Sequence, residues 1–456
     1  MPLFGTRGAA SVTGFGGLAK LGYLLRNSLR FRASNTNYLS RTGGTSTSRR
    51  IHTFSFWTKS SVIGGTRTVI SAGPDDSNRE IIFIDSNKFT YQVKDSNNFY
   101  DLESTQVFRD PAAWYHFVVA VDTTQATNTN RVKIYVNGSQ ITAFGTAVYP
   151  LQNDDLFFND SNGSVSYIGA LRGYVNSTYA YDGYMTEFNF IDGQALTPSS
   201  FGKTDGATGQ WIPIKFGGAY GTNGFYLNFT DASAATAAAI GKDSSGNGNN
   251  WTPSGISVTA GATYDSMTDV PTLTSATAAN YATLNPLAVD ADVTLSNGNL
   301  NFSCTSAGLG GTIGTIAVTS GKWYWEVTPT SGPTGFALGI AKLPLSAYDA
   351  NQTGTYLYLN GGNKRLSPST DSAYGASYTD NDVIGVALDM DAGTVTFYKN
   401  NASQGTAFSS LSGEFTAWVQ DGSNGVASVA NINFGQQPFQ YSAPSGYKAL
   451  NTYNLP

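Results

Sequence analysis

Residues 382–401 read DVIGVALDMDAGTVTFYKNN, and this stretch decides the fold class. Apolar and polar side chains alternate on both sides of an Ala-Gly pair, as in two half-buried strands joined by a tight turn. Ile384, Val386 and Leu388 can face one side of the first strand. Phe397 can oppose them from the second strand, across a turn that glycine permits. The pattern predicts an antiparallel hairpin with Phe397 in a core.

The last third of the chain carries further strand patterns around this hairpin. Residues 321–327 read GKWYWEV and residues 336–341 read FALGIA, and apolar residues return between 433 and 451. In this order they resemble the SPRY fold, and the resemblance covers about residues 286–456. It implies an antiparallel β-sandwich.

Aromatic strand patterns also fill the N-terminal half. They are IHTFSFWT at 51–58, WYHFVVAVD at 114–122, RVKIYVNG at 131–138 and YDGYMTEF at 181–188. The Asn-Gly pair that ends the third is favoured in type I′ hairpin turns. The order of the four strands resembles a laminin-G or concanavalin-A-like jelly roll over residues 31–230.

Composition agrees with an all-β chain of two tandem antiparallel β-sandwich domains behind a short N-terminal arm. Hydrophobic residues make up 40% and charged residues 12% of 456 residues, which is typical of many short strands and tight turns. The single cysteine excludes an intrachain disulfide. We expect an arm at 1–30, a laminin-G-like sandwich at 31–230, an Ala/Ser/Gly/Asn-rich linker with some packed content at 231–285, and a SPRY-like sandwich at 286–456.

The N-terminal arm is basic. Ten of the 26 lysines and arginines precede Asp75, the first acidic residue, so the arm should be attracted to an acidic partner surface. A solvated tail with no fixed partner is the alternative. Leucines between residues 18 and 29 are spaced as on one stripe of a short helix. The residues predicted to anchor the arm are Arg7, Lys20, Arg26, Arg30 and Arg32.

Targeting and nucleic-acid signals are weak. The first thirty residues contain no clean apolar stretch followed by a cleavage site, so we expect no export signal. No run of 18 apolar residues occurs, which argues against membrane insertion. The basic residues lack an accompanying DNA- or RNA-binding motif, so no specific nucleic acid is expected.

Catalytic chemistry has little support in the sequence. His52 and His116 are the only histidines, and both lie in strand patterns, where structural imidazoles are favoured over catalytic bases. A retaining glycosidase needs two carboxyl groups about 5–5.5 Å apart. The nearest approaches to such a pair are Asp101 with Glu103 and Asp389 with Asp391, and we interpret both as structural. We predict a protein that is not an enzyme and needs no cofactor.

The sequence leaves calcium binding open. Laminin-G-like sandwiches often carry a calcium ion on loop oxygens, and carboxylates are the ligands that calcium prefers. Clusters of solvated loop acids look the same in a sequence. The candidate calcium ligands are Asp75, Asp76, Asp154 and Asp155.

Tyrosines in predicted loops could contact sugars. Their rings can stack on sugar faces while the hydroxyl groups form hydrogen bonds. The candidate ligand-binding residues are Tyr174, Tyr179, Tyr220, Tyr374 and Tyr378.

The pairing of a laminin-G-like with a SPRY-like region, joined by the sequence DSSGNGNNW at 243–251, resembles tail-fibre and other structural proteins of tailed bacteriophages. The resemblance implies a virion protein that assembles in the bacterial host cytoplasm and binds tail, adaptor or capsid proteins. It also implies a homo-oligomer, with a trimer as the prior from fibres, and adhesion to a host-surface glycan or receptor. The alternatives are a head decoration or collar protein, a glycan depolymerase, and a cytoplasmic scaffold that holds a peptide in SPRY loops.

Overall fold

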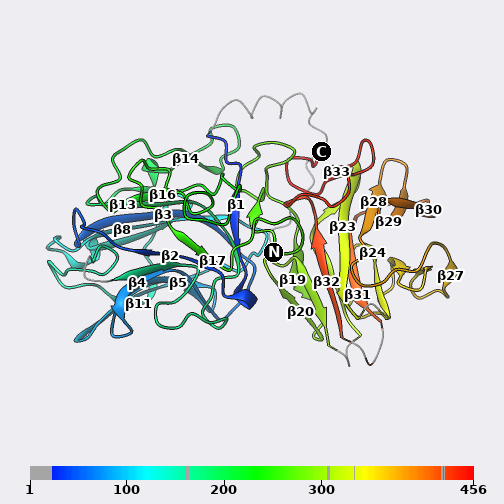
Figure 1. The fold of residues 1–456 in the computed structure, drawn as a ribbon, viewed down its shortest axis with the longest axis horizontal. Coiled ribbons are helices and arrows are strands. Elements are labelled where there is room, and N and C mark those ends of the chain that lie inside the picture. The colour runs from blue at the N-terminus through cyan, green and yellow to red at the C-terminus, as the bar shows by residue number, and fades with distance from the viewer. Residues whose placement is uncertain (1–22, 161–163, 306–308, 333, 423–424, 426) are drawn as a thin grey trace.

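The computed structural model describes residues 23–160, 164–305, 309–332, 334–422, 425 and 427–456. Two antiparallel β-sandwiches lie side by side along the long axis of the molecule (Figure 1). Within the described residues there is no α-helix, and only three short 3-10 turns occur, at Ala33–Asn35, Asn128–Asn130 and Pro198–Ser200. No helix in this part of the chain is long and apolar enough to span a membrane. The predicted all-β fold class is confirmed.

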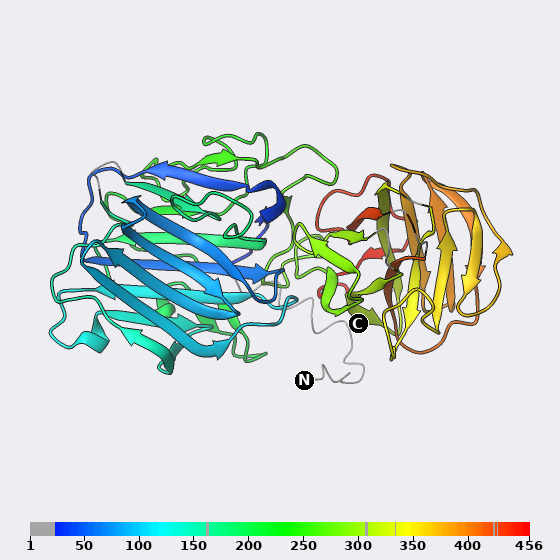
Figure 2. The ribbon, with the colours of Figure 1, turned by 90° about the horizontal axis from the view of Figure 1, so that it is seen from below.

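The first sandwich consists of two large sheets. The first sheet runs in the order β10 (Ser139–Ile141), β9 (Val132–Val136), β8 (Tyr115–Asp122), β3 (Ile51–Ser60), β13 (Gly183–Asp192), β1 (Ser28–Phe31) and β18 (Ser266–Met267), with β16 (Phe225–Leu227) beside β13. The second sheet runs β11 (Phe144–Val148), β7 (Asn98–Val107), β6 (Lys88–Asp95), β5 (Asn78–Asp85), β4 (Thr66–Asp75), β12 (Val165–Ile168), β2 (Tyr38–Thr42) and β17 (Thr252–Ser254). Figure 2 shows the strands of both sheets from below.

Burial along the strands shows which faces are covered. β9 alternates buried and half-buried residues, whereas all residues of β13 are buried. Continuous burial means that both faces of the strand are packed. One face of β13 contributes to the core of the first sandwich. The other face is covered by two parts of the chain. One includes the small hairpin of β14 (Gly202–Thr204) and β15 (Trp211–Pro213), and the other is the segment between the two sandwiches.

The second sandwich also has two sheets. One runs β19 (Leu284–Val289), β22 (Gly311–Val318), β31 (Phe415–Asp421), β24 (Phe336–Lys342), β25 (Thr355–Leu359), β26 (Asn363–Leu366) and β27 (Ser372–Ala373). The other runs β20 (Val293–Ser296), β21 (Asn301–Cys304), β32 (Ser428–Asn433), β23 (Lys322–Ser331), β28 (Ile384–Asp389), β29 (Thr394–Lys399) and β30 (Ala402–Phe408), with β33 (Lys448–Ala449) beside β23.

The hairpin predicted from residues 382–401 is present as β28 and β29. Val386 pairs with Phe397, and both side chains are fully buried in the core of the second sandwich. Gly393 occupies the turn with φ of 64°, in the left-handed region that glycine adopts without strain.

The segment 231–285 is built into both sandwiches more fully than a linker would be. Its strand β17 pairs with β2, and its strand β18 pairs with β1. Trp251 is 1% exposed and belongs to the core of the first sandwich. Because these strands are only two or three residues long, they carry no alternation that a sequence pattern could reveal.

The arm also differs from its prediction. In place of the C-terminal end of the expected helix, residues 28–31 form β1, which pairs with β13 and β18. Arg30 and Arg32 are buried, and each guanidinium forms an ion pair with Asp265, at 3.1 and 2.8 Å. They hold segment 231–285 in place, so their prediction as exposed anchoring residues is wrong. Arg26 is exposed, and Arg7 and Lys20 lie outside the described residues.

Polar contacts join the first sandwich to segment 231–285 and to the second sandwich. Lys59 of β3 donates from Nζ to Asp269 Oδ2 at 2.8 Å and to Asn280 Oδ1 at 2.8 Å. Asp269 also accepts a hydrogen bond from Trp114 Nε1 at 3.0 Å. The Tyr184 hydroxyl donates to Gly298 O at 2.7 Å across the same junction.

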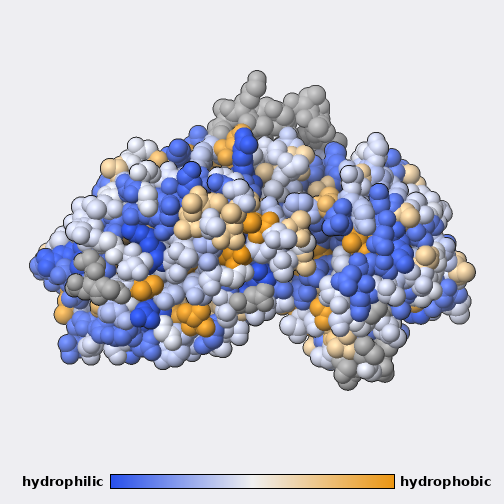
Figure 3. Space-filling view, in the orientation of Figure 1, coloured by the Kyte–Doolittle hydropathy of each residue, from blue (hydrophilic) through white to orange (hydrophobic). Residues whose placement is uncertain are grey.

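Apolar packing continues across the junction. The core of the second sandwich extends to Trp57, Trp114 and Tyr184, which are residues of the first sandwich. Apolar side chains on the visible surface gather in small separate patches, some of them near the middle of the molecule, between polar regions (Figure 3). The two sandwiches are therefore joined by a buried interface and not by a free tether.

Candidate ligand-binding pocket

The pocket begins with an irregularity in β13. Met185 and Phe188 both point into the core of the first sandwich, so two residues lie between them where a regular strand has one. The pairing of β13 with β3 shifts register at this point, which is the signature of a β-bulge. Glu187 occupies the bulge with φ of 52°, which is uncommon for a residue other than glycine. Asn189 Nδ2 donates to Glu187 O at 2.8 Å and holds this conformation.

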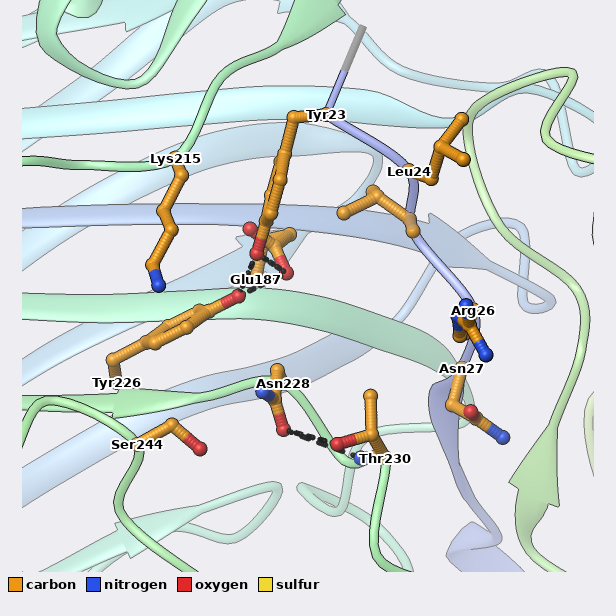
Figure 4. Close-up of a pocket in the computed structure, with 11 residues that line it drawn as sticks. Tyr23, Leu24, Arg26, Asn27, Glu187, Lys215, Tyr226, Asn228, Thr230 and Ser244 are labelled. Atoms are coloured by element: carbon orange, nitrogen blue, oxygen red, sulfur yellow. Dashed lines mark hydrogen bonds between the residues drawn. The ribbon is translucent and has the colours of Figure 1, made fainter. Parts of the chain in front are cut away.

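Two tyrosines converge on the Glu187 carboxyl group (Figure 4). Tyr226, on β16, donates from its hydroxyl to Glu187 Oε1 at 2.6 Å. Tyr23, in the segment before β1, donates to the same oxygen at 3.2 Å. The two hydroxyl groups also form a hydrogen bond with each other. Three segments distant in sequence therefore meet at one carboxyl group.

Burial sets the protonation of this group. Glu187 is 5% exposed, and burial raises its pKa from 4.5 to about 7 against the opposing effects of Tyr226, Tyr23 and Lys215. Burial and the neighbouring carboxyl group also raise the pKa of both tyrosine hydroxyls well above their usual range. Glu187 is thus the group that exchanges a proton near neutral pH, while the tyrosines stay protonated.

The cavity above Glu187 has a volume of about 560 Å³, within the ~300–1,000 Å³ range of small-molecule sites. Lys215 and Arg26 lie on opposite sides of Glu187 in the close-up (Figure 4), and both are exposed. Hydroxyl and amide groups complete the polar lining. The residues around the cavity are Tyr23, Leu24, Leu25, Arg26, Asn27, Glu187, Lys215, Tyr226, Asn228, Thr230 and Ser244.

Among the tyrosines predicted to bind ligand, only Tyr220 lies beside this pocket. Its ring stacks on Tyr226 with 6.4 Å between centroids, and its hydroxyl donates to Asn189 Oδ1 at 3.1 Å. Tyr174 and Tyr179 pack edge to face at 5.9 Å elsewhere on the first sandwich, and Tyr174 is 43% exposed. They form a separate aromatic surface.

The two predicted tyrosines of the second sandwich have structural contacts. Tyr378 is 1% exposed and donates to Tyr358 O at 2.9 Å, so it cannot contact a ligand, and that prediction is wrong. Tyr374 is half-buried, and its hydroxyl donates to Gly405 O at 2.5 Å.

The aspartates proposed for calcium have other partners. Asp75 accepts hydrogen bonds from the backbone N–H groups of its own turn, at 2.8 and 2.9 Å. Asp76 lies 3.9 Å from Arg79. Asp154 accepts from the Tyr100 hydroxyl at 2.5 Å. Asp155 forms an ion pair with Arg50 at 2.7 Å. Across the described ranges, no three His, Cys, Asp or Glu side chains form a group that could hold a metal ion.

The histidines occupy buried structural positions. His116 Nδ1 accepts a hydrogen bond from Trp211 Nε1 at 2.9 Å, and an indole N–H can only donate. The proton of neutral His116 is therefore on Nε2, which donates to Ser55 Oγ at 2.9 Å. Burial lowers the pKa of His116 to about 3 and keeps it neutral. In this tautomer His116 cannot remove a proton from Ser55.

Other candidate catalytic groups are engaged as well. His52 Nε2 lies 3.0 Å from Glu80 Oε1 in the core, where both side chains are fully buried. Glu103 forms an ion pair with Lys88 at 2.6 Å, and Asp389 forms one with Lys322 at 2.8 Å. Asp391 accepts a hydrogen bond from the Gly321 N–H group at 2.7 Å. Asp101 differs from the other three carboxyl groups, because its Oδ1 is buried without a hydrogen-bond partner among the described residues, and burial raises its pKa.

Sequence reasoning missed Glu187, Tyr23, Tyr226 and Lys215. One signal was available, because Met185 and Phe188 are both apolar at a spacing of three, which breaks the period of two around Glu187. The convergence of three distant segments left no local pattern.

Two regions of the chain match known families. Residues 33–200 match the concanavalin A-like lectin/glucanases superfamily, and residues 322–437 match the SPRY domain. Ran-binding protein 10 of Danio rerio is 30% identical over 133 residues, which cover 28% of this chain and 21% of that protein. The chain thus spans about one fifth of the length of this curated relative.

Solved structures give matches of low similarity. The SPRY domain of human HERC1 is 22% identical, covers 35% of this chain and 99% of its own, and has a TM-score of 0.30. A heptameric SAP-like pentraxin from Limulus polyphemus is 14% identical, covers 38% of this chain and 78% of its own, and has a TM-score of 0.29. At this similarity neither structure carries a functional conclusion. The two family matches confirm the predicted combination of domains and indicate a binding function: the chain joins a region that matches the concanavalin A-like lectin/glucanases superfamily to one that matches the SPRY domain.

Proposed function

We propose that the chain is a structural adhesin of a tailed-bacteriophage particle that binds host-surface glycan in the Glu187 pocket. The observation that carries the binding part is the pocket itself. It combines tyrosine hydroxyls, an amide, hydroxyl groups and two exposed cations around a cavity of about 560 Å³. Sites that bind small polar ligands place a few fixed polar groups on such a concave surface.

The rigid construction of the pocket supports recognition. Glu187 is fixed by a bulge, and Tyr226 by its strand pairing with β13. Groups fixed before binding lose little conformational freedom when a ligand arrives. A single weak site of millimolar affinity contributes only about −4 kcal/mol, but several copies on one particle can raise avidity roughly 10²–10⁴-fold.

The particle part of the proposal rests on the sequence resemblance to phage fibre proteins and on one structural observation. The first sandwich has buried contacts with the second through Tyr184 and with segment 231–285 through Lys59 and Asp269, so a pull on one sandwich is transmitted to the other. A protein that attaches a particle to a cell needs such a connection. Residues before Tyr23 would attach the subunit to tail, adaptor or capsid proteins.

A panel of bacterial surface glycans, presented to the purified full chain, tests the binding part. We expect Tyr23→Ala to weaken binding at least roughly tenfold, because it removes one of the hydroxyls at the carboxyl group. Tyr174→Ala is the matched control on the separate aromatic surface. Loss of binding in the control alone would move the site to that surface, and binding to no glycan would refute the adhesin.

A further inference from the structure

The Glu187 pocket is rich in hydrogen-bond donors. Lys215 and Arg26 are exposed, and neither forms an ion pair with another described residue. Asn228 accepts through Oδ1 from the Thr230 N–H and hydroxyl groups, at 3.2 and 3.0 Å. Its NH₂ group is the part that remains for a ligand. Three side chains from separate segments therefore offer donors to the same cavity.

One carboxyl oxygen of the pocket is already used as an acceptor. Glu187 Oε1 accepts from both Tyr23 and Tyr226. With a pKa of about 7, the carboxyl group carries a proton for much of the time at neutral pH and then adds no negative charge. The pocket consequently presents two cations and several donors, which favours a ligand that is anionic and rich in acceptors.

The arrangement of the cations adds a shape requirement. Lys215 lies on one side of Glu187 and Arg26 on the other (Figure 4), with the hydroxyls of Thr230 and Ser244 along the lining. A bare inorganic anion would use one side only. A ligand with one anionic group and several hydroxyls can bind one cation through the anionic group and the other donors of the lining through its hydroxyls.

We propose that the Glu187 pocket selects an anionic sugar, a pyranose that carries a carboxylate or a phosphate group beside its hydroxyls. This inference rests on the proposed function, since it names the class of glycan for the same pocket. Lys215 binds the anionic group, and Asn228 and Tyr23 bind ring hydroxyls.

Protonation of Glu187 regulates this site. The titratable and charged groups that face it are Tyr23 and Arg26 before β1, Tyr226 on β16 and Lys215 after β15, and Tyr220 lies behind Tyr226. The pKa of each of these tyrosines is raised, so their hydroxyls remain neutral. As pH rises through about 7, Glu187 becomes an anion and opposes the ligand. A negative charge on Glu187, inside the same pocket as the anionic ligand, should weaken binding roughly threefold to tenfold.

Titration calorimetry of the full chain with glucuronate, glucose 6-phosphate and glucose, at pH 6 and pH 8, tests the inference. We expect at least one anionic sugar to bind at least roughly tenfold tighter than glucose at pH 6. Binding of glucuronate should weaken at pH 8; glucuronate reports the protonation of Glu187 because its carboxylate is ionised at both pH values, whereas a phosphate monoester gains charge in this range. The better of the two anions identifies the anionic group. Lys215→Gln should abolish the preference for the anionic sugar over glucose. Lys203→Gln, which changes an exposed lysine outside the pocket, should keep this preference. Glu187→Gln should remove the pH dependence of binding.

Two outcomes would overturn it. Equal affinities for glucose and both anions, unchanged by Lys215→Gln, would refute the choice of an anionic sugar and leave glycan binding intact. Failure of all three sugars at pH 6, while the chain still binds glycans of the panel, would also overturn the inference but not the adhesin. Because Lys215 is exposed, its variant should fold even if Glu187→Gln does not.

Discussion

Replacing Lys59 by methionine tests whether the junction between the sandwiches is a structural element. The Lys59 ammonium is 1% exposed and contacts the Asp269 carboxylate at 2.8 Å, the Asn280 amide oxygen at 2.8 Å and Tyr281 O at 3.1 Å. Methionine keeps much of the side-chain volume but removes the charge and all three hydrogen bonds. It leaves the Asp269 carboxyl group, which is fully buried, without its counter-ion.

The expected magnitude follows from this burial. Breaking a buried ion pair by removing one partner costs about 3–5 kcal/mol in free energy of unfolding. A loss of that size lowers the melting temperature of a domain of about 150–250 residues by about 6–20 °C. The loss should shrink at lower pH, because burial raises the pKa of Asp269 and Lys59 opposes that rise. Without Lys59 the carboxyl group protonates more readily and no longer needs a partner.

Lys88→Met is the matched control. Lys88 forms an ion pair of 2.6 Å with Glu103, but the two side chains are 36% and 25% exposed. Such surface pairs contribute about 0–1 kcal/mol. Differential scanning calorimetry of the two variants should therefore separate them clearly. Equal melting temperatures for Lys59→Met and Lys88→Met would refute the reasoning, because the junction would then contribute no more than a surface contact.

The remaining predictions concern the pocket, the second sandwich and the segment between them. Glu187→Gln should remove a pH-dependent loss of stability. Because the pKa of Glu187 in the folded protein, about 7, exceeds the ordinary 4.5, the unmodified protein loses up to about 3 kcal/mol of its free energy of unfolding as pH rises through this range. Urea unfolding of both proteins at pH 5 and pH 8 measures this loss. Gly339→Ala should destabilise the second sandwich by more than about 2 kcal/mol, because the new methyl carbon would lie 1.9 Å from Tyr356 O. Gly361→Ala is the control: its methyl carbon would meet no atom within 4 Å, so the free energy of unfolding should hardly change in the same assay. Trp251→Ala should cost about 3–5 kcal/mol, since the indole packs on Phe225 in the core, and a cost near zero in urea would mean that segment 231–285 is a free linker after all.

Regular strands could be predicted from the sequence because their large apolar residues recur with a period of two, even in β28, which is buried along its whole length. The β28–β29 hairpin shows this, with Val386 opposite Phe397 as the alternation required. The two sandwich regions were predicted from the order of these strands, which resembles two known families, and both regions match such families. Short strands such as β17 and β18 could not, because two or three residues carry no period.

The distribution of charged residues predicted the structure less well than the alternation of apolar and polar residues did. The basic residues before Asp75 look like one solvated arm in the sequence, but Arg30 and Arg32 are buried against Asp265, more than 200 residues later. An ion pair between such distant positions leaves no local signal. Only the three-dimensional structure distinguishes a buried arginine from one that is free to contact a partner.

The candidate site was the least predictable part. Tyr23, Glu187 and Tyr226 come from three segments that meet only after the sheet has formed. The tyrosines chosen for their loops are divided between the pocket side, a separate surface and the core, where Tyr378 is buried. Loop position alone therefore does not identify a ligand contact.

Cryo-electron microscopy of the intact particle tests the central claim most directly, because it shows both where the protein lies and which way its pocket faces. The account predicts two adjoining sandwiches on the tail, with residues before Tyr23 running into a tail or adaptor subunit and the Glu187 pocket open toward the outside. Two sandwiches on the capsid shell, with this pocket covered by a virion protein, would contradict the adhesin. Absence of the protein from purified particles would contradict the particle role altogether.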